Sequence, residues 1–301
     1  MKCLVTGGCG FIGGHLVDAL AIKGHEVVVV DNFSAESNTY WHSNASNVSY
    51  KNFDICDFES MSTLFEEESF EWVFHLAAES RIQPALINPI KASHVNVTGT
   101  STLLNLSRDH NVKRFVYSST SACYGSLNSP PLREDMLNDN LNPYAVTKLA
   151  AEDFCMMYWK TFKTPTVALR YFNVYGNRMP SVGQYAPALA IFMKQRDEGK
   201  PLTVVGDGLQ TRDFVHVSDV VKANIAVAEA PVSDVCGEAF NVGTGHNIPI
   251  IEVAKLIDEN ITHIPERPGE SRDTLCDYSK LNKAVGWEPS VRIETWLGKV
   301  R

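Results

Sequence analysis

The sequence predicts an α/β protein with a doubly wound parallel sheet and a smaller mixed α/β region that follows it. Over the first 175 residues, short runs of β-branched and aromatic residues alternate with helical stretches, which is typical of strand–helix–strand units. The run EVVVVD at residues 26–31 contains four consecutive valines. Such a run is typical of a strand that is buried on both faces of a parallel sheet.

The elements of the first half follow from this alternation. We expect strands at residues 2–6, 26–31, 72–76, 115–118 and 166–171, and a further short strand before Asp54. We expect helices at residues 11–23, near 60–67, at 91–110 and at 144–161. Because each helix joins two parallel strands, right-handed crossovers are expected throughout.

The composition of the chain changes after about residue 175. A Gly-, Pro- and Asn-rich loop is expected at 176–187, then a helix at 188–198, a strand at 202–205, a turn at 206–208, a strand at 240–242, a helix at 250–260 and a loop at 264–272. We therefore expect residues 1–175, with returning segments near 213–243, to form one domain. Residues 176–212 and 244–301 are expected to form a cap that holds the substrate.

Composition excludes several classes of protein. The chain of 301 residues is 44% hydrophobic and 21% charged, which is typical of a folded globular protein. Its net charge of −8 and the lack of a Lys/Arg block disfavour a partner made of duplex nucleic acid. The seven cysteines have no C-x-x-C spacing, which favours reduced thiols over a metal site. No secretory leader and no long apolar run is apparent, so a cytoplasmic location without a membrane span is expected.

Three glycines lie at the first strand–helix junction. Gly7 permits a tight turn, Gly10 allows the backbone to approach a pyrophosphate, and Gly13 allows the helix to pack closely on the strand. The free N–H groups of the helix N-terminus favour phosphate. This pattern and its position predict a Rossmann-type dinucleotide-binding domain.

An acidic residue follows the second strand, 18 positions after Gly13. The carboxylate of Asp31 can accept hydrogen bonds from the ribose hydroxyls of adenosine and would repel a 2′-phosphate. Residues 32–44 contain no Lys or Arg to hold such a phosphate, so NAD is favoured over NADP. Asp54 and Ile55 are candidates to meet the adenine, although an ordinary turn acid explains Asp54 equally well.

Tyr144 and Lys148 are four residues apart at the start of a helix that follows Pro143, so they share one face. Tyrosine ordinarily titrates near pH ~10. A nearby ammonium group and the positive nicotinamide of NAD⁺ favour the phenolate, which can take a proton from a substrate hydroxyl. The alternative is a packed tyrosine beside a solvated lysine.

An ordered set of segments carries a resemblance to a known family: TGGCGFIG, DICD, HLAAES, NVTGT, YSSTSACYG, YAVTK, RYFNVYG, TRDFVHVSDV, FNVGTG and RPGESRD. The chain resembles the extended short-chain dehydrogenase/reductase family over nearly its whole length. It is most similar to the UDP-glucose 4-epimerase-like branch. The resemblance implies NAD as the cofactor, a nucleotide-sugar as the substrate (a UDP-sugar above all), and a transient oxidation at C4 of the sugar.

The same resemblance implies roles for particular residues. Thr120 would hydrogen-bond the reacting hydroxyl, Tyr144 would be the acid/base, and Lys148 would bind the nicotinamide ribose and tune Tyr144. Further residues on the cofactor side are Phe11, Ile12, Asn32, Leu76, Ala77, Ala78, Asn96, Ser118 and Tyr171. Residues on the substrate side are Ser80, Asn173, Val205, Arg212, Arg267, Glu270 and Thr274.

Among the substrate residues, Arg212 and Arg267 would clamp the diphosphate, a task that suits fork-shaped guanidinium groups. The alternative for each is a surface ion pair. Asn173 would touch the diphosphate and Glu270 the nucleotide ribose. Val205 stands where the family often has an aromatic residue that stacks on the base.

The two residues after Thr120 indicate the branch. Sugar-nucleotide 4,6-dehydratases of the family carry Thr-Asp-Glu where this chain has Thr120, Ser121 and Ala122. Without that acid pair an elimination is disfavoured and a 4-epimerase is favoured. A dehydratase or decarboxylase on the same scaffold, and a non-catalytic NAD-sensing protein, are the alternatives. The intact Thr120, Tyr144 and Lys148 disfavour the sensor.

Two further hypotheses concern the sugar and the assembly. The family position of Thr274 is small in enzymes that accept N-acetylhexosamines, so an N-acetyl sugar should fit. The helix at 144–161 is apolar on more than one face, with residues 154–159 all apolar or aromatic. A homodimer would cover the second face; a fully buried helix in a monomer is the alternative.

Overall fold

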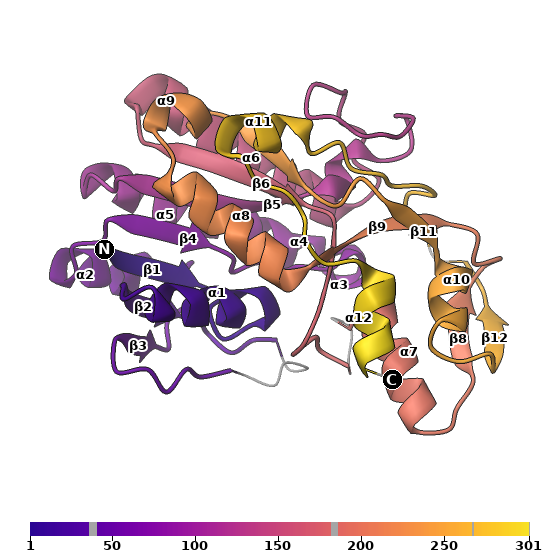
Figure 1. Cartoon of the computed structure of the whole chain (residues 1–301). Helices are drawn as coiled ribbons and strands as arrows, with labels where there is room; N and C mark the ends of the chain where they lie inside the picture. The colour runs from indigo at the N-terminus through magenta and orange to yellow at the C-terminus, as the bar shows by residue number, and fades with distance from the viewer. Residues whose placement is uncertain (36–40, 182–185, 267, 301) are drawn as a thin grey trace.

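A seven-stranded sheet forms the middle layer of the protein (Figure 1). The computed structural model describes residues 1–35, 41–181, 186–266 and 268–300. The strand order is β3-β2-β1-β4-β5-β6-β10, and all neighbouring strands are parallel. The order reverses between β1 and β4, as in a doubly wound sheet. This arrangement confirms the predicted fold class.

The strands of this sheet are β1 (Lys2–Thr6), β2 (Glu26–Val30), β3 (Val48–Lys51), β4 (Trp72–His75), β5 (Arg114–Thr120), β6 (Thr166–Tyr171) and β10 (Ala239–Val242). The four valines of β2 are all buried, because helices cover both faces of the sheet. The bounds of five of the seven were expected to within two residues at each end, and a short strand was expected before Asp54, where β3 lies. β10 was expected to begin one residue later.

Helices cover the two faces of the sheet. On one face α1 (Phe11–Ile22) and α8 (Val217–Glu229) share a core with Cys3 and Val5. On the other face α2 (Phe58–Glu67), α5 (Thr100–Asp109) and α6 (Pro143–Phe162) share a core with Leu4 and Val28. Neighbouring residues of one strand thus point to opposite cores, as the period of a strand requires.

Local sequence explains where α6 begins and ends. Pro143 occupies the first turn, where its missing N–H is not needed, and the side chain of Asn142 accepts a hydrogen bond from Ala145 N at 2.9 Å. The helix ends at Lys163, whose backbone is left-handed with φ 60°. The first turn of α6 therefore has a fixed position, and Tyr144 lies in it.

The single helix expected at 91–110 is interrupted in the structure. It consists of α4 (Pro89–Ser93), a π-helical turn (His94–Gly99) and α5, with the short α3 (Ile82–Ile87) before it. The expected helix at 250–260 is shorter than predicted, since α10 (Ile250–Lys255) ends early. Residues 261–264 instead form β12 (Ile261–Ile264), which pairs with β8.

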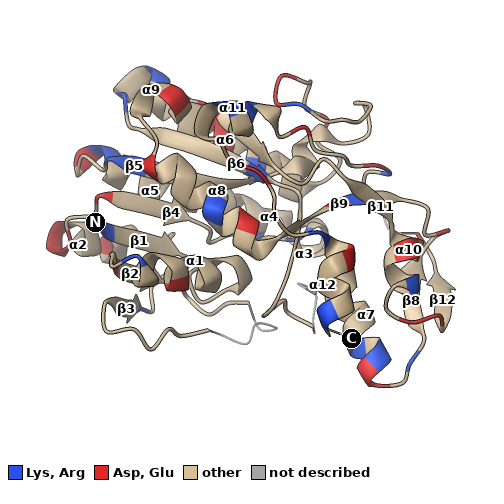
Figure 2. Ribbon diagram, in the orientation of Figure 1, with Lys and Arg blue, Asp and Glu red and all other residues tan. Residues whose placement is uncertain are grey.

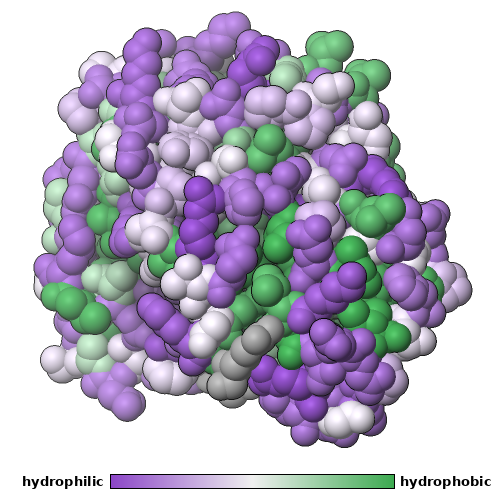
Figure 3. Space-filling model, turned by 45° about the vertical axis from the view of Figure 1, so that its right-hand side comes forward, coloured by the Kyte–Doolittle hydropathy of each residue, from purple (hydrophilic) through white to green (hydrophobic). Residues whose placement is uncertain are grey.

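The smaller region has two sheets and a core of its own. β7 (Asn173–Tyr175), β9 (Thr211–His216) and β11 (Asn247–Pro249) form one sheet, and β8 (Leu202–Val205) pairs with β12. α7 (Ala188–Asp197), α10 and α12 (Ile293–Val300) contribute to a core that contains Phe192, Val204 and Trp296. Figure 3 turns this side forward and shows hydrophobic side chains that reach the surface among hydrophilic ones. The expected division of the chain into domains stays a prediction.

Two short helices, α9 (Val232–Val235) and α11 (Ser279–Val285), complete the chain. In the ribbon, Lys and Arg are interspersed with Asp and Glu rather than gathered on one face (Figure 2). None of the helices that the structure describes is long and apolar enough to cross a membrane.

A buried ion pair fastens α6 to the sheet. Arg170 on β6 and Glu152 on α6 approach to 2.7 Å, and their side chains are only 6% and 4% exposed. Ser119 on β5 donates to the same carboxylate at 2.5 Å, and Arg170 donates to the Tyr124 hydroxyl at 2.9 Å. The pair has hydrogen-bond partners on several elements, which is the condition under which buried charges are tolerated.

We predict that Glu152→Ala lowers the free energy of unfolding by about 3–5 kcal/mol, because it leaves the Arg170 guanidinium buried without its counter-charge. Urea denaturation followed by circular dichroism measures the change. As a control, Arg133→Ala removes an exposed ion pair with Asp135 and should change stability little. Equal losses in both variants would contradict the prediction.

Candidate functional site

A cleft of about 550 Å³ lies beyond the carboxyl ends of the central strands. Its wall includes Gly7 after β1, Leu76 after β4, Thr120 at the end of β5 and Phe172 after β6. In doubly wound sheets, ligands bind in this crevice, where the strand order reverses. Strand topology therefore places the site.

The glycine loop enters the cleft as backbone alone. Gly7 has φ 68°, and a Cβ there would lie 2.7 Å from the backbone nitrogen of Ala77. A Cβ on Gly13 would overlap the carbonyl oxygen of Gly7. Gly10 is the N-cap of α1 and offers no side-chain oxygen to the first-turn N–H groups. Those N–H groups can accordingly serve a phosphate.

Acidic residues lie at the end of the cleft that is predicted to hold the adenosine. Asp31, half-buried at the end of β2, accepts hydrogen bonds from Cys9 N at 3.1 Å and Phe33 N at 2.9 Å. Burial raises the pKa of Asp31, and these two hydrogen bonds oppose the rise. Asn32 donates to Asp54 at 3.0 Å, and both line the cleft beside Ile55. The predicted cofactor residues at this end thus lie together.

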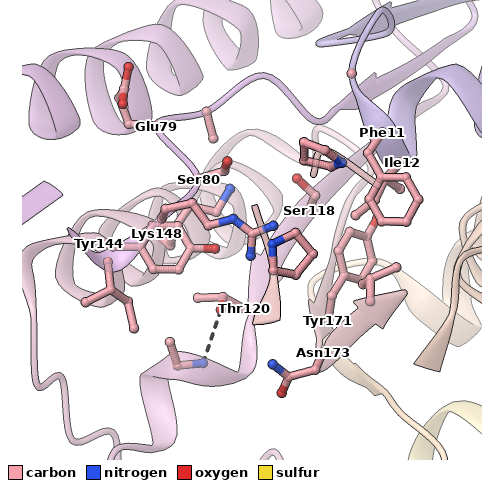
Figure 4. A pocket seen from close by; sticks show the side chains of 18 of the residues that line it. Phe11, Ile12, Glu79, Ser80, Ser118, Thr120, Tyr144, Lys148, Tyr171 and Asn173 are labelled. Carbon is pink, nitrogen blue, oxygen red and sulfur yellow. Dashed lines mark hydrogen bonds between the residues drawn. The ribbon is translucent and has the colours of Figure 1, made fainter. Parts of the chain in front are cut away.

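The residues predicted to be catalytic converge in another part of the same cleft (Figure 4). Thr120 ends β5, while Tyr144 and Lys148 lie on successive turns of α6. Figure 4 shows the side chains of Tyr144 and Lys148 side by side, with Ser118 and Thr120 close to them. The Thr120 hydroxyl also accepts a hydrogen bond from Ala122 N at 3.1 Å, which fixes the short 3₁₀ turn after β5.

Burial controls the charges of Tyr144 and Lys148, the predicted catalytic pair. Lys148 is 3% exposed, and its ammonium lies 4.3 Å from the centre of the Tyr117 ring. Burial lowers the pKa of Lys148 to about 7. Burial raises the pKa of Tyr144, while a hydrogen bond from Thr120 and the charge of Arg81 oppose the rise. The protein alone therefore holds Tyr144 as a phenol; a bound nicotinamide cation would favour the phenolate.

A neutral histidine supports the floor of the cleft. His75 lies 2.7 Å from the Thr6 hydroxyl through Nδ1 and 2.9 Å from the Thr100 hydroxyl through Nε2. Thr100 itself donates to the carbonyl of Asn96 at 2.6 Å, so its oxygen must accept from His75 Nε2–H. Burial lowers the pKa of His75 well below its ordinary value, and Lys148 lowers it further.

Asn96 lies behind the cleft rather than in its wall. Its amide accepts from Glu79 N at 2.8 Å and donates to Glu79 O at 3.1 Å and to the Thr147 hydroxyl at 3.0 Å. The π-helical turn directs this side chain inward. Asn96 thereby positions the segment that leads to Ser80, and its place on the cofactor side stays a prediction.

Most of the remaining predicted residues line the cleft. They are Phe11, Ile12, Leu76, Ala77, Ala78, Ser118, Tyr171, Ser80, Asn173, Val205, Arg212, Glu270 and Thr274. Arg267 lies outside the described residues, as do residues 182–185 of the loop expected at 176–187. The described residues contain no cluster of His, Cys, Asp and Glu that could hold a metal ion.

Arg212 is held rigidly at the substrate end. Its side chain is 12% exposed and lies 3.4 Å from the Glu270 carboxylate. It also donates to the carbonyl oxygens of Thr211 at 2.9 Å and Arg272 at 3.0 Å. Burial lowers the pKa of Arg212. A fixed guanidinium of this kind suits a phosphate group.

Sequence reasoning missed Asp213, which organises this end. Its buried carboxylate accepts from Thr244 N at 2.8 Å, Gly245 N at 2.9 Å and Cys276 N at 3.0 Å. It thus binds two segments, residues 244–245 and Cys276, to β9 next to Arg212. The sequence feature that could have indicated Asp213 is its position next to Arg212 in the segment TRDF. Its hydrogen-bond partners, however, lie far along the chain. Glu79, Arg81 and Lys91 also line the cleft without having been predicted.

Comparison with known proteins agrees with this geometry. Residues 3–243 match the model of the NAD dependent epimerase/dehydratase family. The chain belongs to this family. A UDP-glucuronate 4-epimerase of Thermodesulfobacterium geofontis is 34% identical over 309 residues, which cover 98% of this chain and 93% of that protein.

Two solved structures are similar over the full fold. The UDP-glucose 4-epimerase of Thermotoga maritima with UDP-glucose has a TM-score of 0.92 at 34% identity, covering 99% of this chain and 96% of that one. The UDP-N-acetylglucosamine 4-epimerase of Methanobrevibacter ruminantium in complex with UDP-N-acetylmuramic acid has a TM-score of 0.90 at 31% identity, covering 98% and 95%. Family membership thus extends through both regions of the chain.

We predict that Asp31→Asn reduces the preference for NAD over NADP about tenfold, because the charge that repels a 2′-phosphate is lost. Dissociation constants of both dinucleotides, measured by calorimetry, test this. Asp54→Asn, which alters the neighbouring acid, serves as the control and should leave the ratio unchanged. An unchanged ratio in Asp31→Asn would overturn the assignment of Asp31.

We predict that Lys148→Met stabilises the cofactor-free protein near pH 7. Unfolded lysine titrates near pH ~10.4, so between pH ~7 and that value the unfolded chain binds more protons, and wild-type stability rises with pH. The gain in Lys148→Met is therefore largest at or below pH ~7, at most about 5 kcal/mol, and shrinks toward pH ~10. Thermal melts from pH ~6.5 to ~9.5 measure it; a gain that does not change with pH would refute the burial argument.

Proposed function

We propose that the protein is an NAD-dependent nucleotide-sugar 4-epimerase that acts on a UDP-hexose or UDP-N-acetylhexosamine. The observation that carries this proposal is the convergence of Thr120, Tyr144 and Lys148 in a single cleft that Arg212 also lines. A sugar with its diphosphate near Arg212 would extend toward Tyr144. Its neighbours in family and fold include 4-epimerases.

The residues of the chain account for proton transfer and orientation. When bound, NAD would supply the acceptor and later the donor of the hydride at C4. Tyr144 takes the proton of the 4-hydroxyl and returns it to the same oxygen after the keto sugar has rotated in the cleft. Thr120 holds the reacting oxygen, and Lys148 favours the phenolate. A diphosphate fixed near Arg212 leaves the sugar itself free to rotate.

The two residues after Thr120 distinguish a 4-epimerase from a dehydratase of the family. Ser121 and Ala122 line the cleft where a dehydratase of the family has an acid pair. Figure 4 shows Glu79 directed away from Tyr144, and Glu79 forms an ion pair with Lys91 at 2.6 Å. Glu79 therefore does not replace the missing acids.

The wall near Thr274 supports an N-acetyl sugar. Thr274 is a small side chain, and its hydroxyl accepts a hydrogen bond from Asp213 N at 3.3 Å, which holds it against the wall. Val205 offers no ring to stack on the base, so the base would be held by packing and backbone contacts.

The assembly and location are part of the proposal. α6 turns Cys155 and Tyr158 toward the sheet, while Phe154 and Met157, each 37% exposed, face outward with Val146. We propose a homodimer that covers this second face. The thiols are free and mostly buried, which suits a reducing cytoplasm.

We predict that the purified protein inverts C4 of UDP-N-acetylglucosamine without added co-substrate, and that Tyr144→Phe lowers kcat by about 100-fold or more while nucleotide binding persists. Product NMR with UDP-N-acetylglucosamine, UDP-glucose, UDP-glucuronate and dTDP-glucose measures the reaction. Loss of water or CO₂ would instead indicate a dehydratase or decarboxylase. NAD binding without turnover of any sugar would indicate a sensing protein. Rejection of the acetylated sugar alone would refute the role of Thr274.

A further inference from the structure

Three segments meet in a cluster of side chains on the outer side of the glycine loop. Arg178, after β7, lies 2.8 Å from the Asp18 carboxylate of α1. Its guanidinium carbon lies 3.6 Å from the ring centre of Trp41, which follows β2 in the chain. Trp41 Nε1 donates to the same oxygen of Asp18 at 3.1 Å. We call this the Asp18–Trp41–Arg178 cluster; each member contacts the other two.

A second contact joins the same two segments. His15 on α1 lies three residues before Asp18, and its Nε2 lies 2.9 Å from the carbonyl oxygen of Asn177. Because a carbonyl only accepts, the imidazole must donate. Burial lowers the pKa of His15, so the ring is neutral at physiological pH. Residues 177 and 178 are thus both attached to α1.

Trp41 connects the cluster to the glycine loop. Its backbone N–H donates to the carbonyl oxygen of Cys9 at 3.2 Å, and a Cβ on Gly14 would lie 3.2 Å from the Trp41 side chain. The N–H of Cys9 in turn donates to Asp31 at 3.1 Å. The cluster is therefore one contact away from the loop and the acid expected to hold the cofactor.

Arg178 also belongs to the segment that forms the substrate wall. Asn173 and Tyr175 on β7, and Pro180 after it, line the cleft. The backbone of Arg178 is left-handed with φ 67°, which is uncommon for a residue other than glycine and persists where surrounding contacts fix it. The contacts of its side chain do so here. The cluster consequently ties the substrate wall to the cofactor wall.

We propose that Arg178 is a positioning residue that keeps the reduced cofactor in the cleft between the two half-reactions. This inference rests on the proposed epimerase function. In the first half-reaction the C4–H bond breaks, the hydride passes to NAD⁺, and the proton of the 4-hydroxyl passes to Tyr144, which leaves a 4-keto sugar and NADH. The second half-reaction returns the hydride from NADH to the opposite face of C4 and the proton from Tyr144 to the 4-oxygen. If NADH left the cleft between the two half-reactions, the keto sugar could not be reduced. The cleft must therefore retain NADH.

The test compares Arg178→Asn with wild type. Asparagine tolerates the left-handed backbone but is too short to reach Asp18 and stack on Trp41. Lys23→Ala is the matched control, because it removes a half-exposed ion pair between α1 and Glu229 of α8 at 2.8 Å. Stopped-flow fluorescence with an excess of NAD⁺ measures the dissociation rate of NADH. Absorbance of free NADH during turnover of the nucleotide-sugar measures leakage.

We expect Arg178→Asn to raise the NADH dissociation rate about tenfold and to release free NADH during turnover, while Lys23→Ala changes neither. Arg178→Lys should retain NADH better than Arg178→Asn does. Trp41→Phe keeps a ring but loses the hydrogen bond to Asp18, so its NADH dissociation rate should lie between those of Arg178→Lys and Arg178→Asn. A structural loss alone would show in thermal melts and would not follow this order. NADH release from Arg178→Asn at the wild-type rate overturns the proposal, whereas wild type that binds no NAD(H) overturns the proposed function.

Discussion

The buried ion pair between Arg170 and Glu152 is the constraint on which the site depends. Glu152 lies one turn after Lys148 on α6, so the rotation that satisfies the carboxylate also sets the direction of the catalytic face. The partners of the pair lie on β5, β6 and the 3₁₀ turn after β5, and Thr120 caps that same turn. One network therefore fixes the helix that carries Tyr144 and Lys148 and the strand that carries Thr120. A buried charge pair is weak evidence of stability but strong evidence of a unique arrangement.

The electrostatics of the cleft differ between the protein alone and the loaded protein. Burial keeps Tyr144 in its phenol form and reduces the charge of Lys148. A nicotinamide cation bound beside them would favour the phenolate form of Tyr144. Neutral His75, buried below, adds no competing charge. We therefore expect Tyr144 to act as a base only when the cofactor is bound.

The sequence predicted those features that local pattern encodes. The valines of β2, the glycine loop and the Pro143 start of α6 each contain their own explanation within a few residues. The π-helical turn at Asn96 is not explained by its local sequence, because the side chain of Asn96 bonds to Glu79 and Thr147, which are far away in the chain. The early end of α10 depends likewise on the pairing of β12 with β8.

The candidate site shows the same division. Residues that line the cleft directly could be named from motifs. The role of Asp213 could not, because it consists of hydrogen bonds to three backbone N–H groups on two distant segments. The segment near 213–243 was assigned to the first domain, but no helix was predicted where α8 lies, because its buried face packs against α1 and the sheet. Side chains that act by holding other segments leave little trace in a single sequence.

The contact between Gly7 and the backbone of Ala77 has a consequence for how this site can change over evolutionary time. Main chain touches main chain at that point, and Gly13 is equally confined. Neither position admits even a methyl group, so the place where a pyrophosphate would lie is closed to variation by substitution. Divergence in cofactor preference is restricted to the adenosine end near Asp31, and divergence in substrate to the wall near Arg212 and Thr274. New specificities in such a scaffold arise at the two ends of the cleft while its centre stays unchanged.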